Sequence, residues 1–215
     1  MRRSSVKPAR QDRSRATEAR LLQAAEEVLA ERGLERAAIP EIAQRAGVSP
    51  ASIYRRFTDK DGLLREVFER FFARSIQSNE TALDPEHWRC RSLEASVRAL
   101  IAGMVAVYSQ KRGLLRAVIA YGEQHPSAAF RRRTAELRKR SVAAIERIVL
   151  LHAGEIKHPN PERAVHFGMQ LVALALKEHI VPASAKSAHD ALTDEELATE
   201  LSRMFLGYLR SGGRR

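Results

Sequence analysis

Apolar residues recur along this chain with the spacing of α-helices. Between Thr17 and Arg32 they fall at i, i+3, i+4, i+7 and i+8, which predicts an amphipathic helix with one buried stripe. A second long helix is expected after Asp59. The same periodicity predicts five more helices, at about 92–110, 114–123, 127–153, 160–181 and 194–210. Because no stretch alternates apolar and polar residues long enough to indicate a strand, the pattern predicts an all-α protein.

A pair of short helices joined by a tight turn is predicted within residues 42–57. The turn falls at Gly47, a residue type that tolerates positive φ, and Pro50 then occupies the first position of the second helix. If Ile53 packs against the first helix, the second helix keeps an outward face. That face holds Ser52, Arg55 and Arg56, flanked by Ala51 and Tyr54. Small and hydroxyl residues can enter a major groove there, while Tyr and Arg reach phosphates and base edges.

The charge distribution adds to this picture. The 215 residues carry a formal net charge of +11, and two short segments hold nearly all of it. Residues 1–20 contain seven basic and two acidic side chains, and residues 131–140 contain six basic and one acidic, so each segment carries +5. Such clusters favour a polyanionic partner, most often nucleic acid. A solvated tail and a solvated helix face are the alternative interpretation.

Composition excludes several classes of protein. With 44% hydrophobic and 29% charged residues the chain is not a disordered protein, and its longest apolar runs, 101–108 and 169–176, are about half of a bilayer span. One cysteine, Cys90, precludes an intramolecular disulfide and fits the cytoplasm. His152 and His158 stand six apart without further ligands, and no catalytic set can be assembled. We therefore expect no metal, no cofactor and no enzymatic activity.

The helix pair resembles a known family. The resemblance covers residues 14–74, with the helix-turn-helix at about 38–57, and its combined spacing is specific. It is carried by Arg32-Gly33, Ile42-Ala43, Ala46-Gly47-Val48-Ser49, Ile53-Tyr54, Phe57, Asp59-Lys60 and Leu63-Leu64. This run is similar to the N-terminal domain of the TetR family of bacterial transcriptional regulators. The resemblance implies a basic flexible arm at 1–13 and a ligand-binding and dimerisation domain at 75–215.

The resemblance also implies DNA contacts. Ser49 would cap the recognition helix, and Ala51 and Ser52 would face the bases. The residues expected to contact the DNA backbone are Tyr54, Arg56 and Lys60, with Arg55 reaching bases or phosphate and Arg13 and Arg15 contributing from the arm. The chain departs from the family in Ala37–Pro40, where a polar or basic residue is common, so contacts from the first short helix are expected to be reduced. The implied partners are double-stranded operator DNA, a second copy of the chain and a small-molecule effector.

The C-terminal part carries no diagnostic motif. Its predicted dimer residues are Leu174, Leu197, Leu201, Met204, Phe205 and Tyr208, for which core packing within one subunit is the alternative. The predicted pocket, for an apolar or aromatic ligand, is formed by Trp88, Met104, Val107, Tyr108, Tyr121, Phe130, His166, Phe167 and Gln170. A surface position for the polar members is equally compatible with the pattern.

The function expected from these features is that of a ligand-responsive repressor that binds a palindromic operator as a homodimer. Two other classes stay open at this point. One is a DNA-binding protein without sequence preference, and the other is a helical small-molecule-binding protein or enzyme whose helix-turn-helix is incidental. Sequence-specific, salt-sensitive binding to a short palindrome distinguishes the regulator from both.

Overall fold

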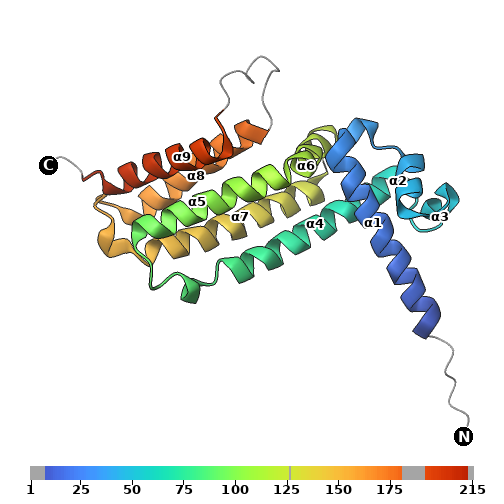
Figure 1. Cartoon of the computed structure of the whole chain (residues 1–215), viewed down its shortest axis with the longest axis horizontal. Coiled ribbons are helices and arrows are strands. Elements are labelled where there is room, and N and C mark those ends of the chain that lie inside the picture. Colours follow the sequence, from blue (N-terminus) through green and yellow to red (C-terminus); the bar gives the residue numbers. More distant parts are fainter. Residues whose placement is uncertain (1–7, 126, 181–191, 213–215) are drawn as a thin grey trace, which may run out of the picture. The chain divides into compact units, whose positions relative to one another are not determined.

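The chain is helical throughout the part that the structure describes. The computed structural model describes residues 8–125, 127–180 and 192–212, and within these ranges it contains α-helices and 3-10 turns and no strand (Figure 1). This confirms the predicted fold class. None of the helices in these ranges is both long and apolar enough to span a bilayer.

The chain divides into two compact units. The first comprises residues 1–72 together with 113–125, and the second comprises 73–112 together with 126–215. The division therefore departs from a simple boundary after residue 74, because a segment from the middle of the chain belongs with the N-terminal unit.

The first unit contains a long helix, two short helices and parts of two others. These are α1 (Pro8–Arg36), α2 (Ile39–Ala46), α3 (Pro50–Tyr54), the first half of α4 (Lys60–Ala82) and α6 (Arg112–Gln124). The predicted stripe on α1 is buried, with Leu21 and Val28 fully enclosed. The helix is interrupted at Gly33, whose φ of 76° and ψ of 175° are not helical.

α1 begins nine residues before the predicted start at Thr17, so residues 8–13 are helical rather than part of an extended arm. Pro8 is suited to a first helical turn, and the residues that follow it are mostly good helix formers. Residues 1–7, and the side chains of residues 8–13, lie outside the described part. The basic arm thus stays a prediction for its first seven residues.

Close packing explains why α6 belongs to the first unit. A Cβ atom placed on Gly113 would lie 1.9 Å from the carbonyl oxygen of Ala30 in α1, so only glycine permits this approach. Farther along α6, Tyr121 is buried, packs against Phe68 of α4 and donates to the carboxylate of Asp61 at 2.5 Å. Burial is the main cause that raises the pKa of Tyr121, and the hydrogen bond with Asp61 raises it further. α6 is therefore anchored at both ends to α1 and α4.

The second unit is a helical bundle. It contains the end of α4 with α5 (Leu93–Gln110), α7 (Ala128–Leu150), α8 (Pro161–Ile180) and α9 (Asp194–Arg210), joined in part by the 3-10 turns η1 (Pro85–His87) and η2 (Ala153–Glu155). α5, α7, α8 and α9 run side by side (Figure 1). Their shared core includes the fully buried Val97, Ile148, Val165, Val172 and Leu209.

Polar contacts complete this unit. The predicted capping box of α9 is present: Thr193 Oγ1 accepts from the Glu196 N–H at 3.2 Å, and Glu196 Oε2 accepts from the Thr193 N–H at 2.8 Å. Two buried polar side chains, Ser96 and His152, lie 3.0 Å apart and satisfy one another. This pairing removes the penalty of burying either group alone.

Candidate functional site

α2 and α3 form the predicted helix-turn-helix. Gly47 adopts φ 67° and ψ 38°, the left-handed conformation expected of it. Its N–H donates to the Gln44 carbonyl at 3.1 Å, and the Val48 N–H donates to the Ala43 carbonyl at 3.0 Å. This pair of bonds ends α2 and turns the chain tightly toward α3. Ala43 and Ile53 are almost fully enclosed, so the contact between the helices is close and the rotation of α3 is fixed.

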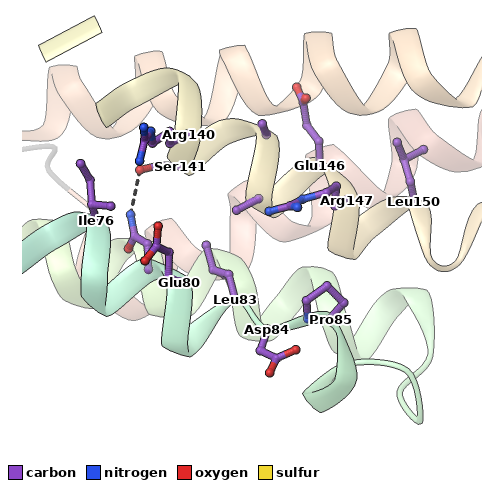
Figure 2. A pocket seen from close by; sticks show the side chains of 13 residues that line it. Ile76, Glu80, Leu83, Asp84, Pro85, Arg140, Ser141, Glu146, Arg147 and Leu150 are labelled. Carbon is purple, nitrogen blue, oxygen red and sulfur yellow. Dashed lines mark hydrogen bonds between the residues drawn. The ribbon is translucent and has the colours of Figure 1, made fainter. Parts of the chain in front are cut away.

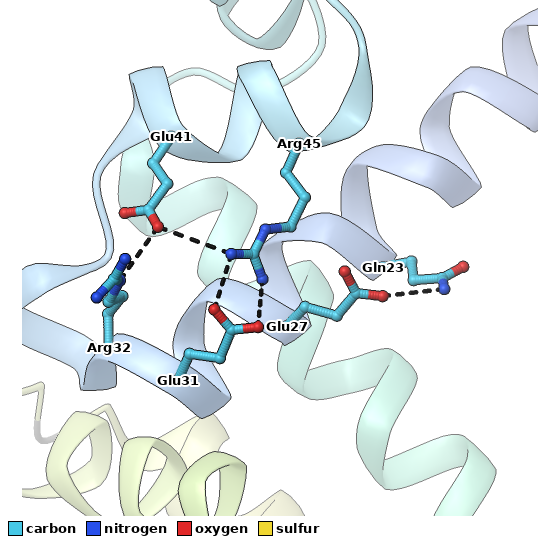
Figure 3. A network of polar contacts seen from close by, with 6 residues as sticks. All are labelled: Gln23, Glu27, Glu31, Arg32, Glu41 and Arg45. Atoms are coloured by element: carbon cyan, nitrogen blue, oxygen red, sulfur yellow. Dashed lines mark hydrogen bonds and ion pairs between the residues drawn. The ribbon is translucent and has the colours of Figure 1, made fainter.

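An ion-pair network joins α2 to α1 (Figure 3). The guanidinium of Arg45 contacts both carboxylate oxygens of Glu31, at 2.6 and 2.7 Å, while Glu41 lies 3.2 Å from Arg32 and 3.8 Å from Arg45. The hydrogen bond with Arg45 lowers the pKa of Glu31 and raises that of Arg45. These groups lie at the surface, exposed or half-buried, so the network contributes more to the orientation of α2 than to stability. Arg45 of α2 is therefore already paired with carboxylates within the unit.

The outward face of α3 is open to solvent. The side chain of Tyr54 is 56% exposed, Ala51, Arg55 and Arg56 are exposed, and Ser52 is half-buried. In the described residues neither arginine forms an ion pair with a carboxylate. Arg55 Nη2 donates to Ser52 Oγ at 2.8 Å, and Arg56 Nη1 donates to the Ser52 carbonyl oxygen at 3.3 Å. A positive, hydrogen-bonding surface with a small residue at its centre can approach a nucleic-acid groove.

The expected side-chain cap by Ser49 is absent, and Lys60 has a hydrogen-bond partner within its own unit. Ser49 occupies the N-cap position of α3, but its side chain makes no capping hydrogen bond, because its Oγ lies 3.0 Å from Ser52 Oγ instead. Lys60 is half-buried, and its Nζ donates to the Leu34 carbonyl oxygen at 3.3 Å, so part of its donor capacity is used within the unit. Arg15 is exposed on α1, whereas the side chain of Arg13 lies outside the described residues.

The predicted pocket residues do not form one lining. Tyr121 belongs to the core of the first unit, and the other eight belong to the second. Of those, Phe130 is buried and Met104 and Tyr108 are packed against the bundle core, while Val107, His166, Phe167 and Gln170 are exposed. The Nε1 of Trp88 donates to the Ala82 carbonyl oxygen at 3.1 Å, and its ring lies beneath Arg91. The predicted residues are therefore divided between core packing and exposed helix faces, which residue type and helical spacing alone do not distinguish.

The second unit contains a pocket elsewhere, between the end of α4 and the second half of α7 (Figure 2). Its volume is about 670 Å³. The lining comprises Ile76, Asn79, Glu80, Leu83, Asp84, Pro85, Arg140, Ser141, Ala143, Ala144, Glu146, Arg147 and Leu150. Asn79 Nδ2 donates to Ser141 Oγ at 2.7 Å and ties the two walls together. The volume is within the range of small-molecule sites.

The charged groups of this pocket differ in their availability. Arg140 is paired with Glu136 at 2.7 Å, and Glu146 lies 2.7 Å from His166 Nδ1. The side chain of Arg147 forms no hydrogen bond or ion pair within the described ranges. None of the lining residues was identified from the sequence. Arg140, Ala143, Ala144 and Arg147 share one face of α7 at spacings of three, four and seven, and this pattern could have revealed them.

An apolar surface lies on α8 and α9. Phe167, Leu171 and Leu174, spaced at i, i+4 and i+7, expose 47%, 38% and 57% of their surface, and Met204 of α9 exposes 44%. Of the predicted dimer residues, Leu174 and Met204 therefore face outward, and Tyr208 is half-buried beside Phe167. Leu197, Leu201 and Phe205 belong instead to the core of the bundle, which corrects their assignment. Met204 lies at the edge of this buried stripe, seven residues after Leu197, so α9 contributes both to the core and to the apolar surface.

Comparison with known proteins agrees with this arrangement. Residues 21–67 match the family model of the bacterial regulatory proteins of the tetR family, a segment that runs from α1 through the helix-turn-helix into α4. A search of curated proteins gave no match. Many solved structures share the fold. One is a candidate TetR-family transcriptional regulator of Mesorhizobium loti, 23% identical, with 92% of this chain and 96% of that chain covered and a TM-score of 0.69.

Two further structures have the same fold. A TetR transcription regulator of Haloarcula marismortui is 19% identical, with 90% and 96% of the two chains covered and a TM-score of 0.65. The transcriptional regulator FadR of Bacillus subtilis, solved in complex with stearoyl-CoA, is 20% identical, with 91% and 99% covered and a TM-score of 0.56. Residues 21–67 thus match the model of the tetR family of bacterial regulatory proteins, and the fold of the chain is that of solved TetR-family regulators.

Proposed function

We propose that this protein is a ligand-responsive transcriptional repressor that binds a palindromic operator as a homodimer. The observation that carries the proposal is the outward face of α3, where Tyr54, Arg55 and Arg56 are exposed and no carboxylate neutralises the two arginines within the described residues. Ala51 and Ser52 allow close approach to a major groove. The protein acts in the cytoplasm, as a regulator and not as an enzyme.

The apolar surface on α8 and α9 supports dimerisation. An exposed phenylalanine, two leucines and a methionine on two packed helices form the type of surface that a second copy covers in helical-bundle dimers. The two recognition helices of the dimer then engage half-sites about one helical turn apart, roughly 34–36 Å, or a multiple of it.

The pocket between α4 and α7 is the proposed effector site. Its apolar walls suit an apolar or aromatic body, and Arg147 can pair with an acidic group. The Bacillus subtilis FadR structure, with stearoyl-CoA bound, supports an acyl ligand as one class to test. Stearoyl-CoA and an uncharged aromatic compound are suitable probes in thermal unfolding, and wild type is compared with Arg147→Ala. A ligand of this site raises the midpoint of wild type and has a weaker effect on the variant.

Selection from a random duplex library by the full chain tests the DNA-binding proposal. The expected product is a two-fold symmetric sequence whose half-sites have a fixed spacing, bound with strong dependence on salt. A protein without sequence preference would enrich no such motif. Tight binding of all duplexes would therefore favour the non-specific alternative, and no binding at all would favour the small-molecule alternative.

A further inference from the structure

Arg55 and Arg56 are neighbours on the outward face, yet they are held differently. The Nη2 of Arg55 donates to the Ser52 hydroxyl at 2.8 Å, and that hydroxyl lies 3.0 Å from the hydroxyl of Ser49. Arg56 instead donates to the backbone carbonyl of Ser52 at 3.3 Å. A side-chain hydroxyl pair thus positions Arg55, one helical turn beyond the small residues that begin α3.

The surroundings leave Arg55 free to act as a donor. A guanidinium carries five N–H donors, and the described contacts of Arg55 use one of them. The cations of the neighbouring helices are in a different situation, since Arg32 and Arg45 are bound to Glu41 and Glu31. Arg55 is exposed and makes no ion pair in the described ranges. Its charge and most of its planar fork therefore point outward.

We propose that Arg55 is a specificity-determining residue, which reads a guanine in each operator half-site, and that Ser52 is the positioning residue that orients it. This inference rests on the proposed function as an operator-binding protein. Guanine presents O6 and N7 side by side in the major groove, and two parallel N–H groups of an arginine match them. A phosphate contact needs no such alignment, because phosphate accepts from many directions.

The Ser52 hydroxyl can favour base contact because it holds the Arg55 side chain in place before DNA binds. A free arginine loses rotamer entropy when it is fixed on a base, whereas one already held by Ser52 loses less. The exposed Ala51 on the same turn keeps that part of α3 narrow, so the helix can approach the groove floor and Arg55 can reach a base edge. Arg56, tied to the backbone, suits a phosphate contact.

The test uses the operator obtained by selection with the full wild-type chain. Each guanine of the half-site is replaced in turn by 7-deazaguanine, which keeps the base pair and removes the N7 acceptor. For one guanine we expect wild type to lose about 5- to 150-fold in affinity. Arg55→Ala should bind both duplexes equally. Arg55→Lys, which keeps the charge without the planar fork, should discriminate less than wild type. Arg56→Ala is the matched control and should keep the wild-type ratio.

Ser52 is tested by the same ratio. Ser52→Ala should reduce the discrimination between guanine and 7-deazaguanine while affinity for a scrambled duplex and the midpoint of thermal unfolding stay at wild-type values. Ser52→Thr retains a hydroxyl and should restore the discrimination. If Ser52 had only a structural role, Ser52→Ala would change the midpoint of thermal unfolding. Ser52→Thr would then not restore the ratio of affinities for the guanine and 7-deazaguanine duplexes.

Two results overturn the proposal and leave sequence-specific binding intact. In one, Arg55→Ala weakens binding to the guanine and the 7-deazaguanine duplexes by the same factor relative to wild type. The wild-type ratio of the two affinities is then retained, and Arg55 is a phosphate contact. The other is a selected half-site without a required guanine. Failure of the proposed function is a different result, in which wild type enriches no symmetric sequence, and it overturns the guanine reading as well.

Discussion

Ile53 and Tyr54 are adjacent in α3 and have opposite surroundings. Ile53 is fully buried against α2, whereas more than half of Tyr54 is exposed. The buried residue sets the rotation of the helix, and this rotation decides which side chains face outward. Packing and the proposed DNA recognition therefore depend on different residues of this helix.

This separation gives a testable contrast. We expect Tyr54→Ala to weaken operator binding with no change in the midpoint of thermal unfolding, because the side chain packs against little. Ile53→Ala should lower the free energy of unfolding by about 2–5 kcal/mol, as for other buried aliphatic truncations. Anisotropy titrations at one salt concentration measure operator affinity, and thermal unfolding measures stability. Wild-type affinity in both Tyr54→Ala and Arg55→Ala would remove α3 from the interface.

Gly113 gives a second prediction at this scale. An alanine there places a methyl group 1.9 Å from the Ala30 carbonyl, so α6 must move away from α1. We expect Gly113→Ala to cost about 1–3 kcal/mol or more. Gly207→Ala is the matched control, since that glycine is in α9 with nothing within 4 Å of its Cβ position, and it should stabilise by up to about 1 kcal/mol. Equal unfolding midpoints for the two variants would contradict the close packing.

At the scale of elements, helix periodicity and capping residues located the helices well. The structure confirms helices at 93–110, 161–180 and 194–210 close to the predicted bounds, because amphipathic stripes, prolines and the Thr193 box act locally. What the sequence did not predict depends on contacts between distant residues. The association of α6 with the first unit and the pocket between α4 and α7 both follow from long-range packing.

In α9, too, the sequence does not predict which apolar residues are buried. The helical pattern identifies these residues, but the buried and the exposed positions of the helix carry similar residue types. Phe205 and Met204 are neighbours in the chain, and the first is buried while the second is exposed. Only the position of α5 and α8 against α9 decides between them.

The capping box of α9 predicts a dependence on pH. Hydrogen bonds from the backbone N–H and hydroxyl of Thr193 lower the pKa of Glu196 from its ordinary value of 4.5. A lowered carboxyl pKa in the folded state contributes stability that is present above pH 4.5 and is lost as the pH falls below it. Glu196→Gln does not titrate, so we expect its unfolding midpoint to fall less than that of wild type between neutral and acidic pH.

The control for this prediction is Glu195→Gln. Glu195 lies in the same first turn and forms no side-chain hydrogen bond with the described residues. Its variant should follow the acid dependence of wild type. Identical pH profiles for wild type and Glu196→Gln would show that the capping carboxylate contributes nothing to acid stability.

At the scale of the whole molecule, the apolar surface of α8 and α9 connects stability to assembly. Leu174 is 57% exposed, so Leu174→Glu should leave the fold of one subunit intact. A buried charge in the proposed interface should dissociate the dimer. Sedimentation velocity should show a monomer, with operator affinity reduced at least about tenfold because only one half-site is engaged at a time. Leu151→Glu, an exposed leucine after α7, should remain a dimer. A dimeric Leu174→Glu would place the interface elsewhere.

The basic cluster at 131–140 is the remaining large-scale feature. Arg140 is occupied by Glu136, whereas Arg131 and Arg132 are exposed at the start of α7. If they contact phosphates, replacing Arg131–Arg133 by alanine should reduce the slope of log affinity against log salt by about 1 for each lost contact. An unchanged slope would assign these residues to a solvated helix face.

The sequence preference of the protein is measured most directly by competition between duplexes. The full chain is bound to a labelled duplex selected by wild type, and unlabelled selected and scrambled duplexes of equal composition compete at about 150 mM salt. We predict that the dissociation constant for the scrambled duplex is at least about 1,000-fold higher. Equal competition by the two duplexes would contradict the account, because a chain without sequence preference cannot act as an operator-specific regulator.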